Sequence, residues 1–139
     1  MAGTSWEAAG SVRAMTLSIG MVTVDSTDPR PLARWWARHL GGRVVDEADG
    51  WFLEVVPADG VTAPVLGFQR VEDPTPGKNR LHLDLGTSDR AADVAALVAD
   101  GATVVGEHTM PGFGWTVLAD PQGNQFCVGA PESSATTVG

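Results

Sequence analysis

The stretch HLDLGTSDRAADVAALVADGATVV, residues 82–105, is the most informative part of this chain, because an earlier stretch follows the same order of elements. It opens with a short apolar strand pattern, continues through an Asp-led helical pattern that ends at Gly101, and returns to a strand pattern. The stretch MVTVDSTDPRPLARWWARHLGGRVV, residues 21–45, has the same order about sixty residues earlier. The two stretches share few identical residues, so the repeat lies in the order of elements. It predicts two βαβββ units.

The first copy contains an amphipathic helix pattern. Asp28-Pro29 is a favourable start, because a side-chain acceptor precedes a proline ring whose φ is already helical. Gly41 and Gly42 end the pattern. We expect one apolar stripe to be buried against a sheet, and it consists of Leu32, Trp35, Trp36 and Leu40.

The second copy contains a similar helix pattern. Ser88 or Asp89 is the expected cap, and Gly101 is the expected stop. The apolar stripe consists of Val94, Leu97 and Val98.

Alternating apolar residues predict the strands. They span 15–24, 43–45, 51–56 and 65–71 in the first unit, and 82–85, 102–105, 114–119 and 124–129 in the second. A linker at 73–78, with two prolines and a glycine, separates the units, and DPQGN at 120–124 closes the last hairpin. We predict one domain over 15–130, with modules at about 15–72 and 79–130. Residues 1–14 are a predicted loose leader and 131–139 a predicted frayed tail.

Composition excludes several classes of function. Nine basic and seventeen acidic residues give a net charge of −8, which argues against nucleic acid and against an anionic membrane surface as partners. No apolar run approaches the ~20 residues of a spanning helix, and the first fourteen residues lack the features of a signal peptide. The single cysteine fits a reducing compartment. We therefore expect a cytoplasmic protein.

The repeat, the DPQGN turn and the strand LHLDL at 81–85 together resemble the glyoxalase / bleomycin-resistance / extradiol-dioxygenase superfamily, also called vicinal oxygen chelate proteins. The resemblance covers residues 17–129, almost the whole predicted domain. It implies an α+β fold in which two βαβββ modules form a curled mixed sheet around a cavity. It also implies that a homodimer commonly completes this cavity.

The resemblance implies four metal-ligand positions, two on the opening strands of the modules and two on their closing strands. In module two they fall on His82 and on Cys127, where the enzymes usually carry glutamate. In module one they fall on Met21 or Gly20 and on Leu66 or Gly67, none of which is a ligand for a hard ion. His39 lies on the predicted helix and His108 in a predicted loop, so neither supplies an obvious further ligand. One imidazole and one thiol are too few for a stable site, so we predict no metal and no cofactor.

His82 and Asp84 are the candidate catalytic residues. They stand two positions apart on a predicted strand, so both side chains face the expected cavity, while Leu81, Leu83 and Leu85 face the helices. Three interpretations remain open: a polar pair that orients a ligand, an imidazole general base beside a carboxylate, or two groups with purely structural partners.

The remaining candidate ligand-binding residues are mainly apolar. Trp115 follows the segment PGFG at 111–114, which we interpret as a mobile, glycine-hinged edge over the pocket. Aromatic walls suit a planar or apolar ligand. Cys127 alternates with Phe126 and Val128, so it faces the cavity and is expected to be an inert apolar residue. The other candidates are Met21, Trp51 and Phe113, with Met110 as a possible addition to the lining.

Two classes of function follow. The first is a metal-independent binding protein of the bleomycin-resistance type, which sequesters an aromatic or amphipathic small molecule. The alternative is an enzyme of the same superfamily, a lyase, isomerase or dioxygenase-like protein that uses His82 and Asp84 or an atypical metal site. A basic cluster at Lys78, Asn79 and Arg80 precedes the second opening strand, where it is either a solvated strand end or an attractor for an anionic group.

Overall fold

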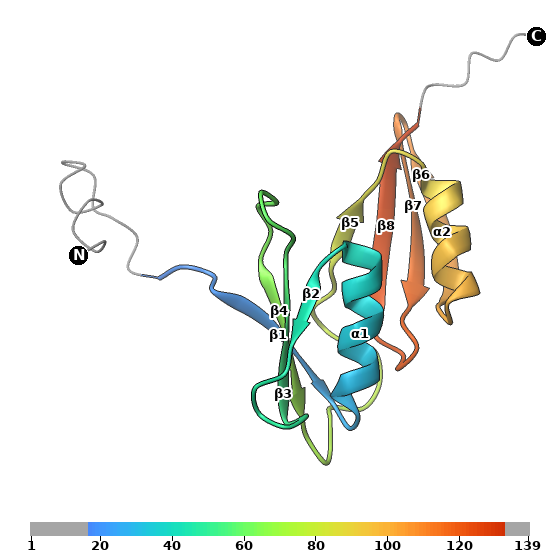
Figure 1. The fold of residues 1–139 in the computed structure, drawn as a ribbon. Helices are drawn as coiled ribbons and strands as arrows, with labels where there is room; N and C mark the ends of the chain where they lie inside the picture. The colour runs from blue at the N-terminus through green and yellow to red at the C-terminus, as the bar shows by residue number, and fades with distance from the viewer. Residues whose placement is uncertain (1–16, 133–139) are drawn as a thin grey trace, which may run out of the picture.

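The computed structural model describes residues 17–132 and contains two βαβββ modules (Figure 1). Module one consists of β1 (Met21–Ser26), α1 (Pro29–Leu40), β2 (Arg43–Val45), β3 (Phe52–Val56) and β4 (Val65–Arg70). Module two consists of β5 (Asp84–Gly86), α2 (Arg90–Ala99), β6 (Thr103–Met110), β7 (Phe113–Ala119) and β8 (Gln125–Pro131). The predicted α+β fold with two such modules is confirmed.

Each module forms its own four-stranded mixed sheet. The strand orders are β1-β4-β3-β2 and β5-β8-β7-β6, so the two sheets have the same topology. In both, the opening strand pairs in parallel with the closing strand, and the other pairs are antiparallel. The duplication read from the order of sequence elements is therefore present in the hydrogen-bonding pattern.

Helix α1 packs on the sheet of module one and lies between that sheet and module two (Figure 1). The ring centroids of Trp36 and Phe126, a residue of β8, are 4.9 Å apart. The indole nitrogen of Trp35 donates to the Asp100 carbonyl at 2.8 Å, and that of Trp36 donates to the Asp120 carboxylate at 3.1 Å. One continuous core thus joins the modules: Leu32, Ala33, Trp35, Trp36, Ala37, Leu53, Val55, Leu66, Phe68, Leu97, Ala102, Leu118, Phe126 and Val128.

The ends of the helices agree with the sequence patterns except in details. Gly41 is left-handed at the end of α1, with φ of 67°. Asp28 occupies the N-cap position, but its side chain caps no backbone group; instead the Ser26 hydroxyl accepts a hydrogen bond from the Asp28 amide. Asp89 caps α2 as predicted, accepting from the Ala92 amide.

Three residues expected to be buried are exposed. Leu40 is 41% exposed because it lies in the last turn of α1. Val98 is 43% exposed, and Leu97 is the only residue of α2 that is fully buried. Leu81 is 68% exposed because it precedes β5, whereas Leu83 and Leu85 pack against the core as expected. Both described helices are too short to cross a membrane.

The strand boundaries differ most at two places. The strand predicted at 15–24 is β1, and it starts at Met21 because its ladder with β4 begins at the Met21–Val65 pair. The segment predicted as a mobile edge at 111–114 contains the tight turn of a long hairpin, in which Met110 pairs with Phe113. Residues 1–16 and 133–139 lie outside the described residues. These undescribed ranges contain the whole predicted leader and all of the predicted tail except its first two residues, of which Pro131 closes β8.

Candidate functional site

The open face of module two is the side of its sheet that faces away from the helices. On β7 and β8 the residues buried against the core include Thr116, Leu118, Phe126 and Val128. The alternate residues therefore project to the opposite side. The pairing register places Trp115 beside Gly129, and both Val117 and Asp84 beside Cys127. This face carries most of the residues selected from the sequence.

An aromatic shelf of Phe113, Trp115 and His108 covers part of this face. Trp115 stacks on His108 with ring centroids 5.2 Å apart, and on Phe113 with centroids 6.2 Å apart. Phe113 lies close over Gly129, where an added Cβ would be 2.5 Å from the Phe113 ring. Gly129 therefore holds space that the aromatic ring fills, and replacing it would displace the shelf.

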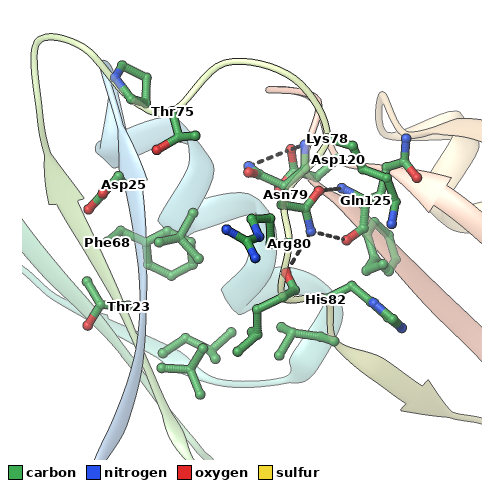
Figure 2. A pocket seen from close by; sticks show the side chains of 18 of the residues that line it. Thr23, Asp25, Phe68, Thr75, Lys78, Asn79, Arg80, His82, Asp120 and Gln125 are labelled. Carbon is green, nitrogen blue, oxygen red and sulfur yellow. Dashed lines mark hydrogen bonds between the residues drawn. The ribbon is translucent and has the colours of Figure 1, made fainter.

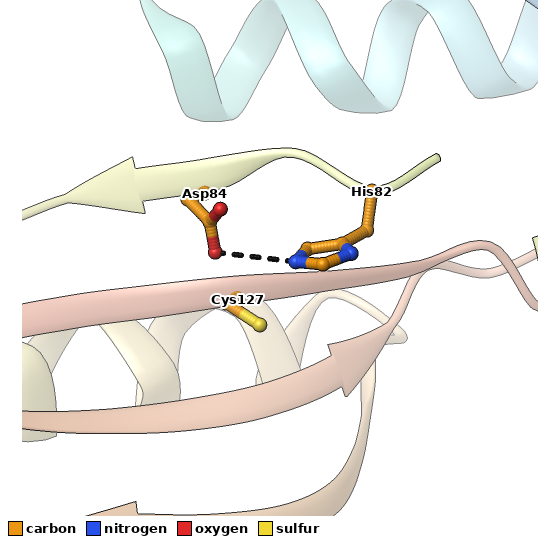
Figure 3. Close-up of side chains that lie close together, drawn as sticks. All are labelled: His82, Asp84 and Cys127. Atoms are coloured by element: carbon orange, nitrogen blue, oxygen red, sulfur yellow. Dashed lines mark ion pairs between the residues drawn. The ribbon is translucent and has the colours of Figure 1, made fainter. Parts of the chain in front are cut away.

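His82, Asp84 and Cys127 form a polar cluster beside the shelf (Figure 3). One potential ligand atom from each lies within 4.8 Å of the other two. The His82 Nε2 and Asp84 Oδ1 atoms are 3.5 Å apart, and the side chains are 43% and 75% exposed. At this distance and exposure the pair is a weak, solvent-screened interaction.

The Cys127 thiol is shifted toward its neutral form. Burial raises its pKa, and the nearby Asp84 carboxylate raises it further by charge repulsion and by hydrogen bonding, while Lys78 acts in the opposite direction. A thiol with a raised pKa is a poor nucleophile at neutral pH, because the thiolate is the reactive form. This environment agrees with the inert role expected for Cys127.

Two adjoining hollows lie over the open face. The larger, about 540 Å³, is lined by residues that include Met110, Phe113 and Asp84. The smaller hollow, about 440 Å³, is lined by residues that include His108, Val117 and Lys78. His82, Trp115 and Cys127 line both hollows. Both volumes are in the ~300–1,000 Å³ range of small-molecule sites. An aromatic wall and a polar cluster thus face the same space.

The structure brings together five of the seven residues predicted to bind ligand: His82, Asp84, Phe113, Trp115 and Cys127. Met21 lies in module one, with its sulfur over Gly67 on the sheet. Trp51 is 56% exposed, and the Arg70 guanidinium lies 4.9 Å from its ring centroid. Neither Met21 nor Trp51 lines the two hollows of the open face, so both lie outside this site in the described part of the chain.

Sequence reasoning missed the role of His108. It was assigned to a loop, but it lies on β6, paired with Trp115. The signal was the PG pair at 111–112, which is a turn signal between two extended segments. Read as a hairpin turn rather than as a hinge, it would have placed His108 and Met110 opposite Trp115 and Phe113.

The polar cluster suits a different ion from the hard divalent ions that the family resemblance implies. The positions expected to supply ligands in module one carry Met21, Leu66 and Gly67, which offer no oxygen or nitrogen side-chain donor. Module two offers one imidazole, one carboxylate and one thiol. This mixed set fits zinc, which accepts nitrogen, oxygen and sulfur ligands, and does not fit magnesium. Sequence analysis counted only His82 and Cys127, whereas the geometry adds Asp84 as a third donor.

Two βαβββ modules, each with one helix and a four-stranded mixed sheet, define the fold class. The sequence comparison identifies the family: residues 21–129 match the glyoxalase-like domain, and the chain belongs to this family. The comparison with curated proteins found no match.

Solved structures share the fold. A glyoxalase/bleomycin resistance protein/dioxygenase family enzyme from Burkholderia phytofirmans PsJN is 17% identical, with a TM-score of 0.69 over 84% of this chain and 100% of its own. A superfamily member from Sphaerobacter thermophilus is 24% identical, with a TM-score of 0.64 over 84% and 99%. TioX from Micromonospora sp. ML1 is 17% identical, with a TM-score of 0.58 over 83% and 99%. At these identities the similarity shows the fold alone, and any chemistry has to be inferred from the residues of the site.

Proposed function

We propose that this protein binds an aromatic or amphipathic small molecule on the open face of module two, without a metal ion. The observation that carries the proposal is the aromatic shelf, in which Trp115 stacks with Phe113 and His108 beside the polar cluster. A planar ligand gains contact area by stacking on this shelf. His82 and Asp84 then orient its polar end by hydrogen bonds.

A second copy of the chain completes the site in this proposal. The open face of module two lies at the surface, and Phe113 and Met110 on it are 38% and 55% exposed. Module one has an open face of its own, which carries Met21, and α1 lies between the two modules (Figure 1). Pairing the open face of module one with that of module two in a second copy would enclose the ligand. A homodimer therefore accounts for apolar residues left exposed on both modules.

Tryptophan fluorescence and calorimetry test the binding proposal. Titration with a panel of planar aromatic compounds should quench the Trp115 emission and give saturable heat. Trp115→Ala should weaken binding by at least tenfold, because a stacked aromatic contact is removed. Trp51→Phe is the matched control, since Trp51 lines neither hollow, and it should leave affinity unchanged. Failure of every compound to bind, or equal affinity in Trp115→Ala, would overturn the proposal.

One observation favours a second candidate, an enzyme of the superfamily with an atypical metal site. His82, Asp84 and Cys127 lie close enough together to hold one ion, and three protein ligands with an open position are typical of catalytic zinc sites. A bound zinc ion would act as a Lewis acid there. Elemental analysis of protein purified without chelators separates the candidates. Near-stoichiometric zinc that disappears in His82→Ala would favour the enzyme; absence of metal together with ligand binding would favour the binding protein.

A further inference from the structure

A separate cavity of about 310 Å³ lies between the two modules (Figure 2). Its apolar wall is formed by β1, β4, α1 and β8, which contribute Val22, Val24, Leu66, Phe68, Trp36 and Phe126. The segment 74–83, which links the modules, forms the other wall. Trp115, Phe113 and Cys127 do not line this cavity, whereas His82 lines both the cavity and the hollows of the open face, so the two sites adjoin at His82.

The linker wall is fixed by hydrogen bonds. Asn79 donates from Nδ2 to the carbonyls of Leu81 and Gln125 at 2.8 and 2.9 Å, and its Oδ1 accepts from the Gln125 amide at 2.8 Å. These bonds attach the linker to β8. The cavity is therefore bounded on this side by a segment whose backbone is tethered at Asn79.

Arg80 supplies a cationic group to this cavity. Figure 2 shows its side chain extending from the linker into the hollow, with Asp25 and Phe68 on the opposite wall. None of the ion pairs found within residues 17–132 includes Arg80 or Lys78, and Lys78 also lines the cavity. A cationic group beside an apolar wall is the arrangement that an amphipathic anion requires.

The acidic residues of the cavity further restrict the kinds of ligand that fit. The Asp120 carboxylate is buried and accepts hydrogen bonds from the Trp36 indole, the Gln122 amide and Asn124, so its charge is already satisfied. Asp25 stands across the cavity from Arg80 and disfavours a second negative charge on the far end of a ligand (Figure 2). The ligand chemistry that fits is one anionic end on an apolar body.

We propose that the cavity between the modules binds a medium-chain monocarboxylate. Its carboxylate pairs with Arg80, and its hydrocarbon body lies against Phe68, Leu66 and Trp36. The cavity volume is at the lower end of the range for small-molecule sites, which excludes large ligands. This binding does not depend on the proposed function of the open face.

Octanoate is the probe, and the indole resonances of the tryptophans report the site by NMR. The Trp36 indole, which donates to Asp120, lies in this cavity, whereas Trp115 lies on the open face. Octanoate should shift the Trp36 resonance saturably and leave that of Trp115 in place. Affinity should rise about fourfold per methylene from butanoate to octanoate, as expected for buried hydrocarbon. Octan-1-ol, which lacks the charge, and suberate, which carries a second carboxylate, should bind more weakly than octanoate.

Arg80→Gln removes the charge and leaves a shorter polar side chain, and it should weaken octanoate binding about tenfold. Arg80→Lys should restore part of the affinity. Arg34→Gln is the matched control, since Arg34 is an exposed arginine of α1 that does not line the cavity. Equal binding of octanoate and octan-1-ol, an unchanged affinity in Arg80→Gln, or a shift confined to Trp115 would each overturn the proposal. If octanoate does not bind in the cavity while aromatic compounds still bind at Trp115, the cavity proposal is wrong and the proposed function of the open face stands.

Discussion

At the scale of single residues, Cys127 shows how a neighbouring charge sets the chemistry of a side chain. Alternation along β8 predicted that it faces away from Phe126 and Val128, and it lies on the open face. Alternation alone does not reveal the neighbour across the sheet. The β5–β8 register places Asp84 beside Cys127, and burial together with this carboxylate raises the pKa of the thiol.

Asp84→Asn should make Cys127 more reactive. Removing the carboxylate lowers the pKa of the thiol toward its ordinary value, so a larger fraction is thiolate at pH 8. Alkylation by iodoacetamide, followed by mass spectrometry between pH 7 and 10, should be several-fold faster in the variant at the lower end of this range. Asp25→Asn, on the wall of a different cavity, is the control. Identical pH profiles for Asp84→Asn and the wild type would show that Asp84 does not control the thiol.

At the scale of elements, α1 shows where sequence patterns are sufficient and where they are not. The spacing of Leu32, Trp35 and Trp36 predicted which face of the helix is buried, and all three are buried. The helical periodicity of apolar residues predicts which face of a helix is buried, but it does not predict which element packs against that face. Both indoles donate to acceptors in module two that are more than sixty residues away in the chain. No local sequence pattern predicts such contacts.

Trp36→Phe tests how much the contact between α1 and module two contributes to stability. The substitution keeps an aromatic ring but removes the indole donor to Asp120, whose Oδ2 still accepts from Asn124. We expect a loss of about 1–2 kcal/mol in the free energy of unfolding, measured by urea denaturation. Trp51→Phe, at an exposed position, should change stability by less than about 0.5 kcal/mol. Equal effects of the two substitutions would contradict a special role for Trp36.

The end of α2 gives a pH-dependent prediction. Hydrogen bonds from His39 and then from Arg38 lower the pKa of Asp100, so the folded state binds the proton less tightly than the unfolded chain, whose pKa is about 3.9. The interaction therefore stabilises the fold above that pH and is lost as the pH falls through the lowered value. Asp100→Asn should decrease Tm slightly at pH 7, and the deficit should shrink as the pH falls below about 3.9 and through the lowered pKa of Asp100. A deficit that does not shrink on acidification would contradict this origin.

At the scale of the whole molecule, the repeat predicted two like modules but not their arrangement. The order of strand, helix and strands is local information, and both sheets follow it. The relative placement of the modules depends on the linker, on Asn79 and on the two tryptophans of α1. That placement separates Met21 and Trp51 from Trp115, although the sequence suggested one shared pocket. A second copy is the arrangement that would bring these surfaces together.

We therefore predict that the protein forms a homodimer. Leu17 and Ile19, in the segment before β1, are each 84% exposed, which is unfavourable for apolar residues unless another surface covers them. Light scattering with size-exclusion chromatography should give the mass of a dimer at micromolar concentration. The double variant Leu17→Asp, Ile19→Asp should shift the equilibrium toward monomer without lowering monomer stability, because neither side chain belongs to the core. Phe113→Asp, on the open face of module two, should dissociate the dimer as well if that face is shared. A wild-type chain that remains monomeric at every concentration would leave the open face uncovered, and a ligand on it would then have to be held by module two alone.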